Sequence, residues 1–146
     1  MKIFAICAAV TSVALAFAMS PGVTVKAVPG KGANGKAPVT VSIAIPEGYH
    51  IYGPKETTGI STSVKVKGTA FKAVKVSYPK TKVIKVVGQK LEVYETAVSI
   101  PVVLQSTKKV KGVQKVTLQV TSQACNDRVC LPPDTKTIEV NVNFGK

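Results

Sequence analysis

Two cysteines near the C-terminal end are the residues of this chain best suited to chemistry. Cys125 and Cys130 have four residues between them, and Pro132 and Pro133 follow. A disulfide over this spacing closes a short ring worth only about 2 kcal/mol, against more than about 4 kcal/mol for a ring of a hundred residues. Two sulfurs on an exposed loop would suit thiol–disulfide exchange. From the spacing alone, a local structural staple is an equally good interpretation.

The neighbours of the cysteines slightly favour exchange. Arg128 lies inside the ring and would stabilise a thiolate, whereas Asp127 would oppose it. Pro132 and Pro133 restrict the backbone where the chain leaves the ring and favour one loop shape. We therefore count Arg128, Pro132 and Pro133 as candidate supporting residues.

Other uses of the cysteines are less well supported. A metal site built from Cys125, Cys130 and His50 would lack a fourth ligand and the usual C-x2-C spacing. Nothing in the sequence places His50 beside a cysteine, so Cys–His nucleophilic hydrolysis is weaker still. For His50 itself, a strand-end residue with a satisfied hydrogen bond is the simpler interpretation, and proton handling is the alternative. The sequence predicts no metal and no cofactor.

The chain carries a net charge of +13, nearly all of it from lysine. A nucleic-acid interface would be expected to show arginine-rich patches with interleaved aromatic residues. The lysines instead alternate with apolar residues, as in Val64–Lys67, which is typical of a solvated sheet face or a guarded edge. We predict no nucleic-acid partner, while attraction to acidic partners or an anionic membrane surface stays open.

The N-terminus has the parts of a secretory signal peptide. Met1-Lys2 precedes an apolar run, Ile3 to Ala18, that ends in small residues, and cleavage is expected after Ala18. A retained membrane anchor is the alternative, but the run is short for a span. The mature protein is expected to be periplasmic or secreted, without stable membrane insertion. Cys7 would leave with the signal, so one cysteine pair would remain where disulfides persist.

Short segments with period-two alternation predict strands along the rest of the chain. No stretch has sustained helical periodicity, so we expect an all-β fold, an immunoglobulin-like antiparallel β-sandwich. Pro101 interrupts one segment and suggests an edge strand or a bulge. We divide the chain into a signal peptide (1–18), an N-terminal strand or linker (19–37) and a sandwich domain (38–146). The predicted strands cover residues 23–28, 39–45, 63–67, 70–78, 83–87, 98–104, 116–122 and 138–144.

Three motifs, in order, carry a family resemblance. Gln123–Pro133 resembles the active-site loop of the N-terminal periplasmic domain of the thiol:disulfide interchange protein DsbD, with its Gln-x-Cys and Cys-x-Pro-Pro pattern. Gly48–Tyr52 is similar to the Gly-Tyr-x-x-Tyr stretch of that family, and Lys90–Tyr94 to its Lys-Ser-Glu-x-Tyr stretch. The similarity spans roughly Pro38 to Val142. Well-known members have one more residue between the cysteines and an aromatic cap where this chain has Val86–Gln89.

The resemblance implies a sandwich with a redox-active cysteine pair. Cys130 would form the mixed disulfide with a partner, Cys125 would resolve it, and Tyr52 and Tyr94 would line or support the site. For these two tyrosines, a plain packing role is an equally good interpretation. In the family, electrons come from the rest of the transporter and pass to periplasmic thioredoxin-like proteins, including disulfide isomerases and cytochrome c maturation proteins.

This chain is expected to act as a stand-alone, monomeric domain that receives electrons from a separate membrane protein. The competing hypothesis is a non-catalytic binding module in which the Cys125–Cys130 disulfide is only structural.

Overall fold

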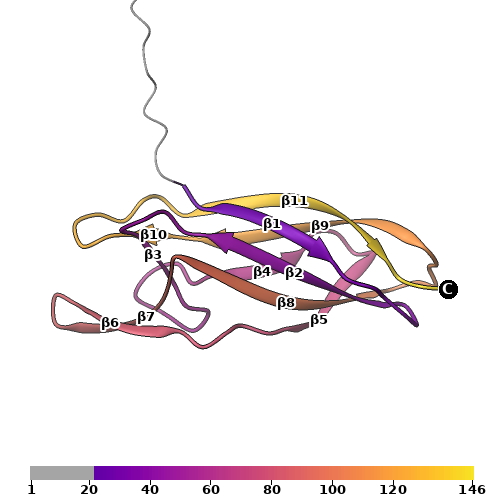
Figure 1. Cartoon of the computed structure of the whole chain (residues 1–146), viewed down its shortest axis with the longest axis horizontal. Coiled ribbons are helices and arrows are strands. Elements are labelled where there is room, and N and C mark those ends of the chain that lie inside the picture. The colour runs from indigo at the N-terminus through magenta and orange to yellow at the C-terminus, as the bar shows by residue number, and fades with distance from the viewer. Residues whose placement is uncertain (1–21) are drawn as a thin grey trace, which may run out of the picture.

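The computed structural model describes residues 22–146 and shows an all-β sandwich with antiparallel strand pairing (Figure 1). The predicted signal peptide lies outside the described residues. No helix occurs within 22–146, and hence none that could cross a membrane. One sheet has the order β1-β2-β8-β5, and the facing sheet has the order β11-β9-β4. Their bounds are β1 Thr24–Pro29, β2 Lys36–Ala44, β8 Ala97–Ser106, β5 Phe71–Val76, β11 Asp134–Asn143, β9 Val113–Ser122 and β4 Ser63–Val66.

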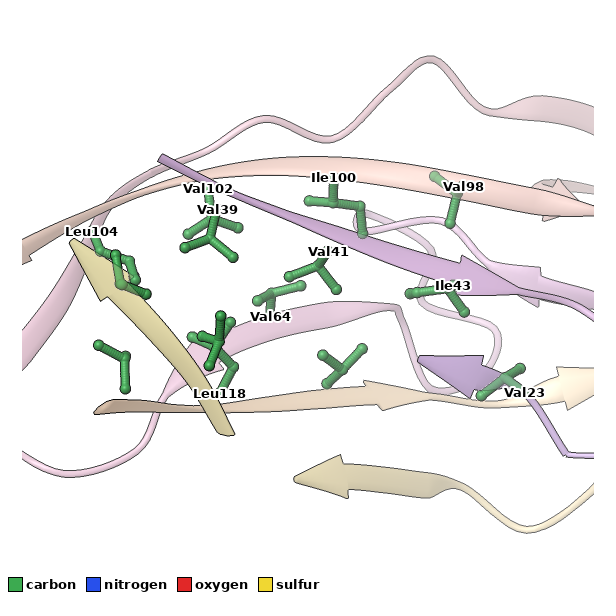
Figure 2. Close-up of a cluster of buried hydrophobic side chains, with 14 of the residues drawn as sticks. Val23, Val39, Val41, Ile43, Val64, Val98, Ile100, Val102, Leu104 and Leu118 are labelled. Atoms are coloured by element: carbon green, nitrogen blue, oxygen red, sulfur yellow. The ribbon is translucent and has the colours of Figure 1, made fainter. Parts of the chain in front are cut away.

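The main core lies between these two sheets. Alternate residues of β2 and β8 point inward, and Val64 of β4 and Leu118 of β9 point toward them from the opposite side (Figure 2). Most of these side chains are completely buried, and almost all are aliphatic. Full burial of one such side chain contributes about 1.5–3 kcal/mol. We call this buried set (including Val39, Val41, Ile43, Ile100, Val102, Leu104, Leu118 and Val120) the sandwich core.

A third, smaller sheet lies at the end of the sandwich opposite the C-terminus (Figure 1). Its order is β10-β3-β7-β6, and all its pairings are antiparallel. Three of its strands are neighbours in sequence of long sandwich strands: β3 follows β2, β7 precedes β8, and β10 follows β9. The small sheet is therefore held in place by the sandwich. Its strands are β10 Ala124–Cys125, β3 His50–Tyr52, β7 Gln89–Glu95 and β6 Lys82–Val86.

Single residues carry the chain from one sheet to another. Between β7 and β8, Thr96 has a left-handed backbone conformation with a φ of 64°, which is unusual for a β-branched residue. Its carbonyl accepts a hydrogen bond of 2.8 Å from the Ile45 amide, just after β2. Gln123 makes the corresponding step between β9 and β10. These two connections set where the small sheet begins.

The expected fold class is confirmed, and each predicted strand segment is observed with shifted ends. Strands β3, β7 and β10 of the small sheet were not predicted because they are short or do not alternate simply. The segment that we called strand or linker contains β1, which pairs with β2 along its whole length. Lys65 is exposed between inward-pointing neighbours of β4, so it belongs to a solvated face as expected.

Of the two alternatives for Pro101, the edge strand is wrong, while a bulge-like register shift does occur in the neighbouring strand β5, between Ala73 and Lys75. This proline lies in β8, which is a central strand between β2 and β5. Its carbonyl accepts a 2.8 Å hydrogen bond from the Ser77 amide, one residue beyond the end of β5 at Val76. The nitrogen of a strand residue points to the same side as its carbonyl. The missing N–H of Pro101 would have bonded to the Ser77 carbonyl, and the regular pairing of β5 with β8 accordingly ends one residue earlier, at Val76.

Candidate functional site

Cys125 and Cys130 form a disulfide across a tight hairpin after β10. The Leu131 amide donates to the Ala124 carbonyl (2.8 Å), and the Asn126 amide donates to the Val129 carbonyl (2.9 Å). The side-chain oxygen of Asn126 also accepts hydrogen bonds from the Arg128 and Val129 amides, at 2.9 and 2.8 Å. An asparagine that bonds the backbone ahead of it is a typical turn former. The segment inside the ring thus builds its own turn.

The two cysteines differ sharply in exposure. Cys125 is only 2% exposed and packs with Tyr52, Leu91 and Val93, a set that we call the disulfide cluster. Cys130 and the turn before it are exposed to solvent. An incoming thiolate or disulfide can therefore reach the Cys130 side of the bond, while Cys125 is shielded by the small sheet.

Tyr52 touches both halves of the disulfide. Its hydroxyl oxygen lies 3.5 Å from the Cys125 Sγ and 3.8 Å from the Cys130 Sγ. Disulfide sulfurs carry no hydrogen, so the tyrosine O–H is the donor in these weak contacts. The same O–H can donate to whichever sulfur becomes a thiolate when the bond opens. Tyr52 therefore places its hydroxyl next to both sulfur atoms of the disulfide.

The loop after β3 covers the Tyr52 ring. Gly59 lies so close to it that a Cβ atom there would be 2.1 Å from the ring Cε2. The Thr62 hydroxyl donates a 2.6 Å hydrogen bond to the Tyr52 carbonyl. A larger residue at position 59 would displace either the loop or the ring. The loop and the tyrosine therefore form one packed unit.

Glu56 fastens this loop to the small sheet. One carboxylate oxygen accepts hydrogen bonds from the Thr57 and Thr58 amides and from the Thr58 hydroxyl, and the other accepts from the Glu92 amide of β7. These bonds, that of Glu92 foremost, lower the Glu56 pKa to about 2. Sequence reasoning missed Glu56, since an isolated glutamate in a polar loop gives no signal.

Gln123 fastens the same loop to the cysteine hairpin. Its side-chain oxygen accepts a 3.0 Å hydrogen bond from the Ile60 amide, and its side-chain nitrogen donates a 3.2 Å bond to the Leu131 carbonyl. Gln123 belongs to the cysteine motif, but the sequence alone indicates no role for it. Its position immediately before β10 explains why it can reach both segments.

His50 lies beside Cys125. The two residues are directly opposite each other in the β3–β10 pairing, and His50 also pairs with Glu95 of β7. Directly opposed residues of an antiparallel pair place their side chains on the same face. The imidazole is 5% exposed and meets the Tyr52 ring edge-on, with centroids 6.0 Å apart. Burial lowers the His50 pKa, although the charges of Glu95 and Asp127 partly oppose this.

Tyr94 occupies the opposite face of the small sheet. It pairs with Ile51 and packs into the sandwich core, and its hydroxyl donates a 2.7 Å hydrogen bond to the Pro79 carbonyl. Burial, followed by the nearby Tyr78 and Glu92, raises the Tyr94 pKa. The structure thus brings Tyr52 to the sulfurs and leaves Tyr94 on the core side.

The remaining predicted residues surround the hairpin. Arg128 is exposed at its tip, and Pro132 and Pro133 line a cavity of about 350 Å³ together with Leu131 and Ala124. At the position that the family resemblance assigns to an aromatic cap, Val86 packs against the disulfide cluster. Within residues 22–146 no group of three or more histidine, cysteine or acidic side chains is arranged to hold a metal ion.

Comparison with known proteins identifies the family. The family model described as the N-terminal part of the thiol:disulfide interchange protein DsbD matches residues 19–142. The chain belongs to the DsbD N-terminal domain family. This family is named for a thiol:disulfide interchange protein, and the present member has the cysteine pair that such interchange requires. A comparison with curated protein sequences gives no match.

Two solved structures share the fold of this DsbD N-terminal family member. The N-terminal periplasmic domain of ScsB from Proteus mirabilis has a TM-score of 0.64 at 16% identity, over 89% of this chain and 49% of that one. The Neisseria meningitidis DsbD N-terminal domain in its reduced form has a TM-score of 0.50 at 22% identity, over 80% of this chain and 86% of that one. The chain thus spans about half of the ScsB structure.

Proposed function

We propose that this DsbD N-terminal family member passes electrons by thiol–disulfide exchange through Cys125 and Cys130. The observation that carries the proposal is the asymmetry of the pair: Cys130 is exposed, whereas Cys125 is 2% exposed beneath Tyr52. A structural staple needs neither an accessible sulfur nor a hydroxyl directed at both sulfurs. Thiol–disulfide exchange requires access to the sulfur that is attacked, and the difference in exposure directs a partner to Cys130.

In the proposed cycle, the reduced domain donates two electrons. The Cys130 thiolate attacks a partner disulfide, and one partner sulfur leaves as a thiolate. The Cys125 thiolate then attacks the Cys130 sulfur, which forms the intramolecular disulfide and releases the second partner thiolate. The partner is thereby reduced and this domain oxidised. The Tyr52 hydroxyl donates a hydrogen bond to whichever sulfur of the Cys125–Cys130 pair is a thiolate.

The proposed partners are thioredoxin-like proteins, and a separate membrane protein restores the reduced state. The proposed location is the periplasm, or outside the cell, after removal of the signal peptide, with the domain working as a monomer. Family membership and the periplasmic description of the ScsB domain support this placement. We assign Arg128, Pro132, Pro133 and Gln123 to shaping the hairpin that partners meet.

The reduction potential of the cysteine pair tests the proposal. The protein would be equilibrated in glutathione or dithiothreitol buffers, and free thiols counted by alkylation and mass spectrometry. We expect a value between about −180 and −270 mV, the range of working oxidoreductases. A value well below about −300 mV with slow exchange would instead identify a structural disulfide and favour the binding module.

Matched single-cysteine variants test the roles of the two sulfurs. Cys125→Ser keeps the attacking thiol but cannot resolve, so it should accumulate mixed disulfides with a thioredoxin-like protein. Cys130→Ser keeps only the buried thiol and should trap none. The adducts are read on non-reducing gels and by mass. Trapping by Cys130→Ser at the level of Cys125→Ser would contradict the assignment.

A further inference from the structure

His50 has a position that the exchange reaction alone does not explain. It is the only histidine of the chain, it is 5% exposed, and it lies directly across from Cys125 in the small sheet. Among residues 22–146 its imidazole finds no hydrogen-bond partner, yet none of its nitrogen atoms is sealed from solvent. Opposed side chains of an antiparallel pair have Cβ atoms about 4.5–5.5 Å apart. The ring therefore lies alongside the cysteine that attack from outside does not reach.

A cavity connects this histidine to solvent. It has a volume of about 620 Å³ and is lined by His50, by the turn before β3, by the β6 strand and by Asp127 of the cysteine hairpin. The cavity thus opens beside the His50 side chain. A proton taken up by His50 has a direct route out of the protein.

The buried cysteine needs such a proton acceptor. When the disulfide is open, Cys125 is a thiol packed among Tyr52, Leu91 and Val93, and burial in apolar surroundings raises a thiol pKa. Only the thiolate attacks a disulfide. The Tyr52 hydroxyl lies beside both sulfurs as a hydrogen-bond donor rather than as a base. Glu95 and Lys82 also lie on this face, but His50 is the titratable side chain that pairs directly with Cys125.

We propose that His50 is the proton acceptor that turns the Cys125 thiol into the resolving thiolate. This proposal rests on the exchange function proposed above. In the mixed disulfide between Cys130 and a partner, the Cys125 S–H proton moves to the free imidazole nitrogen. The Cys125 sulfur then bonds to the Cys130 sulfur, and the Cys130–partner bond breaks. The partner sulfur leaves with the electron pair, and the imidazolium releases its proton through the cavity.

The charges around His50 fit this role. Glu95 faces it from β7 and forms an ion pair with Lys82 of β6, Asp127 comes from the hairpin, and Glu47 and Lys85 line the same cavity. Burial keeps the pKa of His50 below its ordinary value, so the ring is neutral and ready to accept at neutral pH. The carboxylates then stabilise the imidazolium that forms. A base that accepts a proton during resolution must release it afterwards. The opposing effects of burial and of the two carboxylates on the His50 pKa suit both steps.

A two-step reaction with a chromogenic aromatic disulfide separates the two cysteines. The full chain carrying Cys7→Ser is reduced and mixed with the reagent. Attack by Cys130 releases the first coloured thiolate, and resolution by Cys125 releases the second. We expect His50→Gln to leave the first phase unchanged and to slow the second about tenfold, the effect of about one unit in thiol pKa. The pH midpoint of the second phase should rise. Tyr94→Phe, which changes a side chain on the opposite face of the small sheet, is the matched control.

The outcomes of this experiment distinguish the two proposals. If neither phase is observed in the parent chain, the exchange function itself fails. If both phases occur and His50→Gln changes neither the rate nor the pH midpoint of the second, only the role of His50 is overturned. Circular dichroism of each variant checks that the fold is retained.

A second measurement needs no histidine variant. Since the chain has a single histidine, its imidazole proton resonances are assigned without ambiguity. We expect the His50 titration in Cys130→Ser, where Cys125 is a free thiol, to differ from that in the Cys125→Ser, Cys130→Ser double variant, because a thiolate and an imidazolium on one face raise each other's charged fraction. Identical titration curves would overturn the proposal even if His50→Gln does not fold.

Discussion

The sandwich core and the disulfide cluster are built on opposite principles. The sandwich core is almost entirely aliphatic and fills the space between two long sheets. The disulfide cluster has only four buried residues, and two of them, Tyr52 and Cys125, carry polar or reactive atoms. The small sheet separates the two, with Ile51, Tyr94 and Ala124 on the core face and Tyr52 and Cys125 on the other. The residues of the sandwich core and the residues around the disulfide thus lie on opposite faces of the small sheet.

This separation teaches how a reactive pair can be placed on a stable scaffold. Adjacent residues of β3 and β10 point in opposite directions, so each strand anchors itself in the core with one residue and presents the next to the disulfide. Substitutions in the sandwich core should therefore lower stability without changing redox behaviour. Substitutions in the disulfide cluster should change redox behaviour more than they lower stability.

The largest stability effect is expected in the sandwich core. Leu118→Ala removes a fully buried side chain from β9 and should cost about 2–5 kcal/mol of unfolding free energy. The reduction potential of the cysteine pair should not change while the protein is folded. Urea unfolding and thiol counting measure the two quantities. Val113→Ala, at an exposed site of the same strand, should change stability by less than about 0.5 kcal/mol.

Loss of the disulfide should have a smaller effect than loss of one core leucine. The ring between Cys125 and Cys130 is short, so replacing both residues by serine should cost only about 2 kcal/mol. The hairpin keeps its own hydrogen bonds through Asn126. The protein should therefore still unfold cooperatively in urea. A double variant that no longer folds would show that the disulfide is a main structural element and would favour the binding module.

The two tyrosines provide the most direct comparison of the two faces. Tyr94→Phe loses the hydrogen bond to the Pro79 carbonyl and should cost about 1 kcal/mol of stability, with no shift in reduction potential. Tyr52→Phe loses the hydroxyl beside both sulfurs and should change the reduction potential and the thiol reactivity more than the stability. If the two variants behaved alike in both measurements, the separation of the faces would be refuted.

The smallest effect is expected at Glu56, and it should depend on pH. Its carboxylate is stabilised in the folded state, so its contribution is fully present above the ordinary pKa of 4.5 and disappears as the pH falls toward about 2. Glu56→Gln should therefore be less stable than the parent at neutral pH, and the difference should shrink over that interval. The group is only partly buried and remains in contact with solvent, which keeps the effect modest. A difference that grows on acidification would contradict this linkage.

Much of the fold could be predicted from the sequence because side-chain alternation is a local property. The long strands β2, β8, β9 and β11 alternate clearly, and their segments were found with only shifted ends. The edge position inferred for Pro101 failed because a proline is also tolerated in a central strand next to a neighbour that ends early. The residues around the proline do not indicate which strands will flank it or where those strands end.

The candidate site was predictable only in part. The cysteines, the prolines and Tyr52 could be recognised from one continuous stretch and from motif order. The hydrogen bonds by which Glu56 and Gln123 hold the loop after β3 could not be predicted. Their partners, Glu92 and Ile60, lie far away in sequence. Tyr94 was expected either to line or support the site or to be a packing residue, and strand register directs it to the opposite face from Tyr52.

By itself, the sequence determined the all-β class, the lysine-covered surface and a cysteine hairpin whose turn is formed by its own residues. These features depend on alternation, composition and contacts within a few residues. Only the tertiary structure decided that Cys125 is buried and Cys130 exposed, that Tyr52 reaches both sulfurs, and that His50 lies across from Cys125. The physical reason is strand register: a shift by one residue would turn each of these side chains to the other face.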